Sequence, residues 1–121
     1  MDLKAFFKGT YGTMYYVRNM ASAVDYYKKS FGFKARMESP DWVEFEMPGG
    51  QAICLHKAEP NMKSLPGGTM ILNVVKLKEL CAHLKETGVK FEGEPHNVHA
   101  DDYTVNFIDL DGNQVNLYGT L

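Results

Sequence analysis

The chain has 121 residues, of which 45% are hydrophobic and 23% are charged, and its formal net charge is −2 at neutral pH. This size and composition predict one globular domain with its own core, and the slight negative charge argues against a nucleic-acid partner bound through phosphate neutralisation. No apolar run is long enough to cross a bilayer, so no membrane partner is expected. Only two cysteines and no signal-peptide pattern favour a reducing, cytoplasmic setting.

The first half of the chain predicts a strand, a helix and three further strands. Residues 13–17 are β-branched and aromatic, which is typical of a strand. Hydrophobic residues at helical spacing then predict a helix over 20–31, which Gly32 ends. The strands that follow are predicted at 33–37, 42–47 and 51–56. A tight turn at 48–50 makes the last two strands a hairpin.

The second half repeats this order of elements. It predicts a strand at 70–74, a helix at 77–87 ended by Gly88, and strands at 90–92, 103–108 and 114–118, the last two joined by a turn at 109–112. Residues 58–68, with two prolines and two glycines, are predicted to be the linker. Residues 1–11 are weakly patterned and are interpreted as an N-terminal extension that could pack on a partner.

The two halves also resemble each other in sequence. Phe45–Leu55 aligns with Phe107–Leu117 at an offset of 62, and the Phe, a Gly and the final Leu coincide. A unit of about 50 residues that occurs only twice indicates a duplicated domain rather than a solenoid. We therefore predict a single domain of two modules, about 12–57 and 69–118, with a ligand groove between them.

Strand alternation predicts which side chains line that groove. If Cys54 and Asn116 face it, residues two positions along each strand share the face. The predicted lining is Met14, Tyr16, Trp42, Glu44, Cys54, His56, Ile71, Asn73, Thr104, Asn106, Asn116 and Tyr118. The side chains predicted to pack behind it are Val43, Phe45, Ile53, Leu55, Val105, Phe107, Val115 and Leu117. An aromatic and polar lining of this kind suits a small-molecule ligand.

Three of the lining residues are candidates for catalysis. Cys54 is either a thiolate activated by His56 or a half-buried thiol near an unrelated strand-end histidine. Glu44 is either a general base whose pKa burial raises or a solvated carboxylate. The candidate ligand-binding residues are Tyr16, Trp42, Asn73, Asn106, Asn116 and Tyr118. For Trp42, stacking on a flat ligand competes with ordinary packing at the rim.

Two other polar segments contain metal-ligand residue types. His96, His99, Asp101 and Asp102 cluster in the sequence, but we interpret the segment as a polar loop that leads into a strand and could act as a lid. The acidic segment 109–112 lacks the later ligands of a calcium loop and is predicted to be a turn.

The segments Tyr16–Phe33 and Phe107–Leu117 resemble those of the vicinal oxygen chelate superfamily. That superfamily includes glyoxalase I, bleomycin resistance proteins, fosfomycin resistance enzymes and extradiol dioxygenases. The resemblance covers roughly residues 12–118 and implies an α+β fold. In that fold, two β-α-β-β-β modules form an open concave sheet around the ligand. It also implies a homodimer.

Enzymes of this superfamily usually hold a divalent metal with His, Gln or Glu from the first and last strand of each module. The resemblance places those positions at Gly12, Cys54, Thr69 and Asn116. Gly12 has no side chain, and the other three provide one thiol, one hydroxyl and one amide. This is a poor ligand set for such a metal. We therefore expect no cofactor, with a divalent metal at a shifted site as the alternative.

These observations predict a glyoxalase/bleomycin-resistance-like protein that binds a small molecule between its modules without the usual catalytic metal. The alternative is a glyoxalase-like lyase or isomerase, or a related metalloenzyme with shifted ligands, that uses Glu44, Cys54 or His56. A ligand-free role in partner binding is the third possibility, which the polar lining argues against. Acidic residues near the groove, Glu38, Asp41, Glu44 and Glu46, suggest a cationic ligand.

Overall fold

The computed structural model describes residues 2–110 and 112–121, so Asp111 of the predicted turn 109–112 lies outside the described residues. Those residues divide into two compact units, which are described separately. The first unit is Gly12–Gly68, and the second unit combines residues 2–11 with Thr69–Leu121. Strand β1 (Phe7–Val17) contributes residues to both units.

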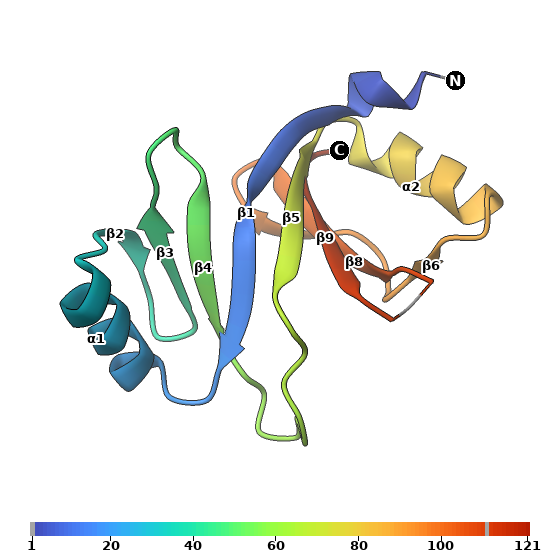
Figure 1. Ribbon diagram of the computed structural model, residues 1–121. Helices are drawn as coiled ribbons and strands as arrows, with labels where there is room; N and C mark the ends of the chain where they lie inside the picture. Colours follow the sequence, from blue (N-terminus) through green and yellow to red (C-terminus); the bar gives the residue numbers. More distant parts are fainter. Residues whose placement is uncertain (1, 111) are drawn as a thin grey trace. The chain divides into compact units, whose positions relative to one another are not determined.

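The first unit is a sheet with one helix packed on it (Figure 1). Its strands stand in the order β2 (Ala35–Glu38), β3 (Trp42–Glu46), β4 (Ala52–Lys57) and β1, and its helix is α1 (Met20–Phe31). The β2–β3 and β3–β4 pairs are antiparallel, and the β4–β1 pair is parallel. Val43, Phe45 and Leu55 are buried beneath apolar residues of α1 such as Val24 and Tyr27.

The ends of α1 follow from local chemistry. Asn19 caps its start, because the side-chain oxygen accepts a hydrogen bond of 3.0 Å from the backbone nitrogen of Ser22. Gly32 ends it in the left-handed conformation at φ 71°, which glycine adopts without steric cost. The helix predicted over 20–31 is confirmed with these bounds.

The second unit has the same kind of sheet and helix. Its strands stand in the order β5 (Thr69–Val74), β9 (Gln114–Thr120), β8 (Asp102–Ile108) and β6 (Lys90–Phe91), and β7 (His96–His99) also pairs with β8. Helix α2 (Leu77–Glu86) buries Leu77, Leu80 and Cys81 against the strands. The β5–β9 pair is parallel and the other pairs are antiparallel, as in the first unit.

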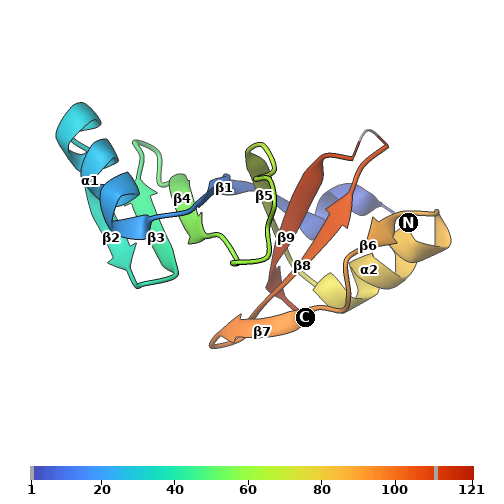
Figure 2. The same ribbon diagram turned by 90° about the horizontal axis from the view of Figure 1, so that it is seen from below.

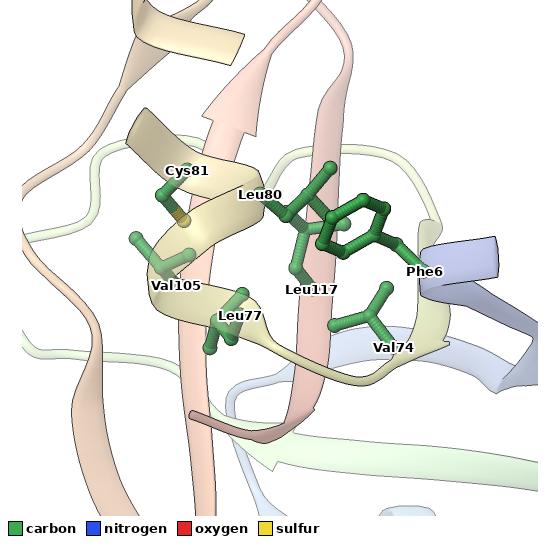
Figure 3. Packing of buried hydrophobic residues seen from close by; sticks show 7 residues of the cluster. All are labelled: Phe6, Val74, Leu77, Leu80, Cys81, Val105 and Leu117. Carbon is green, nitrogen blue, oxygen red and sulfur yellow. The ribbon is translucent and has the colours of Figure 1, made fainter. Parts of the chain in front are cut away.

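Residues 1–11 were interpreted as an extension, and for the described part of that segment this is wrong. Leu3–Phe6 form a short 3-10 helix, η1, whose Phe6 ring packs with Val74, Leu80 and Leu117 in the core of the second unit (Figure 3). The backbone nitrogen of Val75 also donates a hydrogen bond of 2.9 Å to the carbonyl oxygen of Phe6. A single buried ring gives no periodic pattern in the sequence, which is why the segment appeared unstructured.

The segment around His96 and His99 also differs from its prediction as a loop or lid. It forms strand β7, which runs antiparallel beside β8 (Figure 2). All four residues of β7 are exposed, so its sequence lacks the hydrophobic alternation that marks a strand with one buried face. No helix in the described part of the chain is long and apolar enough to cross a membrane.

Candidate functional site

Three rings form a row across the first unit's sheet, on the face opposite α1. Strand register places Tyr16 of β1 beside His56 of β4, and His56 beside Trp42 of β3. The ring centroids of Tyr16 and His56 lie 5.1 Å apart, and those of Trp42 and His56 lie 5.7 Å apart at a near-perpendicular 88°. All three side chains, here called the aromatic row, are half-buried. Half-buried rings keep part of their surface accessible, and that surface can contact a flat ligand.

A partly buried ion pair lies beside the aromatic row. Glu44 is only 5% exposed, and its Oε1 accepts a hydrogen bond of 3.1 Å from Nε of Arg36. Its Oε2 accepts a second hydrogen bond, of 2.8 Å, from Nε1 of Trp42. Arg36 also donates through Nη1 to the carbonyl oxygen of Gly50 at 2.9 Å. The charge of Glu44 is therefore compensated, and its carboxylate restrains the orientation of the Trp42 ring.

Cys54 is fully buried on β4, two residues before His56, and its partner in the β3–β4 register is Glu44. Burial raises the pKa of the Cys54 thiol to about 12, with the charge of Glu44 acting in the same direction and Arg36 opposing it. The thiol is therefore protonated at neutral pH. No hydrogen bond joins Cys54 to His56 within residues 2–110 and 112–121; Nδ1 of His56 lies 2.8 Å from the carbonyl oxygen of Lys57 instead. This arrangement favours the interpretation of Cys54 as a packed thiol rather than an activated nucleophile.

The equivalent face of the second unit carries mostly amides and hydroxyls, together with the carboxylate of Asp102. Nδ2 of Asn116 donates to Oγ1 of Thr104 at 2.6 Å and to Oδ1 of Asn106 at 2.7 Å. Asn73 lies beside Tyr118 in the β5–β9 register, and the hydroxyl of Tyr118 donates to Oδ2 of Asp102 at 2.8 Å. These half-buried groups can donate to and accept from a polar ligand without a formal charge at Asn106 or Asn116.

Sequence reasoning missed Arg36 and Asp102, the charged partners of Glu44 and Tyr118. A register shift between Ala35 and Met37 interrupts simple alternation in β2, so the face to which Arg36 belongs cannot be read from spacing alone. Asp102 was assigned to the supposed loop rather than to β8. The one available signal was Glu44 itself, for which burial was one of the two interpretations, because a buried carboxylate needs a cationic or hydrogen-bonding partner.

The four positions that correspond to metal ligands can be tested unit by unit. In the first unit, a Cβ added at Gly12 would overlap the carbonyl oxygen of Ala52, so this backbone has no space for a side chain there. The other first-unit position holds the protonated thiol of Cys54. In the second unit, Oγ1 of buried Thr69 accepts from Nε2 of Gln114 at 3.3 Å, and the amide nitrogen of Asn116 is already engaged. Among the described residues, no three His, Cys, Asp or Glu side chains lie close enough to hold a metal ion.

Comparisons with known proteins concern nearly the whole chain. Residues 12–117 match the model of the Glyoxalase/Bleomycin resistance protein/Dioxygenase superfamily. No curated protein gives a significant sequence match.

Solved structures share the fold at low sequence identity. Methylmalonyl-CoA epimerase from Mycobacterium tuberculosis is 15% identical with a TM-score of 0.80, over 100% of this chain and 93% of that one. A glyoxalase/bleomycin resistance protein/dioxygenase superfamily member from Vibrio splendidus 12B01 is 17% identical with a TM-score of 0.67, over 88% and 95%. The Mn(II)-bound glyoxalase from Novosphingobium aromaticivorans is 16% identical with a TM-score of 0.68, over 94% of this chain and 39% of that one. At these identities the likeness shows the fold alone.

Proposed function

The chain belongs to the Glyoxalase/Bleomycin resistance protein/Dioxygenase superfamily, and we propose that it binds a small molecule on the polar sheet faces of its modules without the usual catalytic metal. The observation that carries this proposal is the aromatic row of Tyr16, His56 and Trp42, half-buried and set beside a compensated ion pair. Flat rings beside a few fixed polar groups are typical of small-molecule sites. Asn73, Asn106, Asn116 and Tyr118 are the corresponding candidates for hydrogen bonding on the second unit's face.

The absence of the metal is proposed from the chemistry of the four family positions. Hard and borderline divalent cations are held by several carboxylate, imidazole or thiolate donors. Gly12 has no donor, Thr69 and Asn116 are neutral, and Cys54 supplies a single thiol. These residues do not fit the family metal, so no chemical step is assigned to it.

A second candidate function is a metal-free lyase or isomerase, and His56 is the observation that favours it. Among the three residues predicted to be catalytic, Glu44 already accepts hydrogen bonds at both oxygens and Cys54 carries its proton. His56 is the remaining one of the three residues, and an imidazole nitrogen without a hydrogen on it can accept a proton from a ligand. In this alternative His56 acts as the general base toward a bound ligand.

A thermal-shift screen of planar aromatic compounds tests the binding proposal, with hits measured by the fluorescence of Trp42, the single tryptophan of the chain. We expect Tyr16→Ala to weaken the hits about two- to tenfold, because a lost ring contact costs roughly 0.5–1.5 kcal/mol. Tyr26→Ala is the matched control, because Tyr26 is an exposed tyrosine of α1, which packs on the opposite face of the sheet. A screen without hits, or hits that bind Tyr16→Ala and wild type equally, would contradict the proposal.

We also propose a homodimer in a reducing compartment. Light scattering should give about twice the 13.7 kDa mass of one chain. Two free and buried cysteines, Cys54 and Cys81, are compatible with a cytoplasmic location, which expression of a fluorescent fusion would test.

A further inference from the structure

The hydrogen bond of His56 fixes which ring nitrogen carries its proton. Nδ1 lies 2.8 Å from the carbonyl oxygen of Lys57, and a carbonyl oxygen can only accept. Nδ1 must therefore be the protonated nitrogen. In the neutral imidazole, Nε2 then carries no hydrogen and can only accept a hydrogen bond. The donor and acceptor nitrogens of the ring are therefore fixed.

Nε2 of His56 makes no hydrogen bond to any residue in the described ranges 2–110 and 112–121. The N–H donor of the neighbouring Trp42 ring, Nε1, donates to Oε2 of Glu44 at 2.8 Å. A half-buried acceptor without a protein partner is satisfied by water or by a ligand that donates a hydrogen bond. This is the group on the aromatic row that can discriminate between ligands of the same shape.

The charge around the aromatic row favours an uncharged ligand. Glu44 is paired with Arg36 at 3.1 Å, and Glu38, another of the four acids suggested to attract a cation, is paired with Lys28 at 2.9 Å. A cation placed against Trp42 would therefore find the carboxylate of Glu44, to which the indole donates, already compensated. The remaining two acids, Asp41 and Glu46, are exposed to solvent.

We infer that the aromatic row selects a flat, uncharged aromatic ligand that donates a hydrogen bond from a hydroxyl or ring N–H to Nε2 of His56. This inference rests on the proposed function and names its ligand class. Tyr16 and Trp42 supply ring contacts that depend on shape, and His56 supplies the polar selection. The same molecule with its donor capped by a methyl group keeps the ring contacts and loses the hydrogen bond.

The tautomer can be tested without any ligand. Nitrogen-15 NMR of the imidazole rings at about pH 8, where histidine is mostly neutral, distinguishes a protonated Nδ1 from a protonated Nε2. The His56 signals are assigned by their loss in His56→Phe, which retains a ring on the row. We expect protonated Nδ1 and bare Nε2. A dominant Nε2–H tautomer would overturn the inference and leave the binding proposal standing.

The selection is tested with 2-naphthol and 2-methoxynaphthalene, which differ in one hydrogen-bond donor. Calorimetric titration should show 2-naphthol binding wild type about tenfold more tightly, the effect of one hydrogen bond of roughly 1.4 kcal/mol. His56→Phe should bind the two probes equally, with the methoxy compound retaining its wild-type affinity. Equal binding of the probes to wild type would overturn the inference alone. Binding of neither probe would contradict the aromatic row as a ligand site and overturn both proposals.

Discussion

In the first unit, the sheet face opposite α1 carries three rings and a partly buried ion pair, whereas the equivalent face of the second unit carries mostly amides and hydroxyls. Cys54 and Asn116 occupy equivalent positions, as do Glu44 and Asn106. Both faces satisfy their buried polar atoms, and no buried side-chain nitrogen or oxygen of the described residues lacks a hydrogen-bond partner. The two units therefore share their strand pairing while their sheet faces carry different chemistry.

The largest expected effect concerns a feature that the two units share. A Cβ at Gly12 would overlap the carbonyl oxygen of Ala52, and a Cβ at Gly119 would overlap that of Val74. We expect Gly12→Ala and Gly119→Ala each to destabilise the protein by about 3 kcal/mol, because backbone must move to admit the methyl group. Urea denaturation measures both. Gly67→Ala is the control, since nothing lies within 4 Å of its added Cβ. Equal stability of Gly12→Ala and the control would show that the first family metal position is sterically open.

Removing the charge of Arg36 from the first unit should cost more stability than removing a neutral hydrogen bond from the second unit's face. Arg36→Met leaves the carboxylate of Glu44, whose side chain is 7% exposed, without its cation, and we expect a loss of about 2 kcal/mol. Asn106→Leu in the second unit removes one neutral hydrogen bond from Asn116 and should cost about 1 kcal/mol. Adding Glu44→Gln to Arg36→Met should recover part of the loss. If Arg36→Met costs no more than Asn106→Leu, the ion pair does not distinguish the faces.

The smallest effect depends on pH and concerns the equivalent pair Cys54 and Asn116. The folded state keeps the Cys54 proton up to a pKa of about 12, against an ordinary value of 9.0, so the thiol favours folding below pH 9.0 and this contribution is lost as pH rises toward 12. The stability advantage of wild type over Cys54→Ala should therefore shrink from about pH 8 to about pH 10. Its advantage over Asn116→Ala should stay constant, because an amide does not titrate. Parallel curves for the two variants would contradict the raised pKa.

Several elements could be predicted because their signals are local. The ends of α1 depend on a helical period, Asn19 and Gly32, all within a few residues of one another. Strand β7 could not be predicted, because it owes its structure to pairing with β8 rather than to a buried face. The burial of Phe6 likewise depends on residues about 70 positions away in the chain.

The residues of the candidate site could be predicted from the sequence, but their ion-pair and hydrogen-bond partners could not. Alternation placed Tyr16, Trp42, Glu44, Cys54 and His56 together on one face, and the register of the first unit brings them together. The partner of Glu44 depends on a register shift in β2, and the tautomer of His56 depends on one backbone carbonyl. Neither leaves a pattern in the sequence. The roles of these residues in binding or catalysis stay predictions.

We propose binding without the family metal, and the metal content of the purified protein is the first measurement to make. Wild type and Asn116→Glu should be purified without chelator and analysed by inductively coupled plasma mass spectrometry. We predict no stoichiometric metal in either, because one added carboxylate at position 116 does not complete a ligand set. We also predict no thermal stabilisation by added nickel, zinc or manganese. Stoichiometric metal in wild type would contradict the proposal and favour an enzyme whose ligands lie at shifted positions.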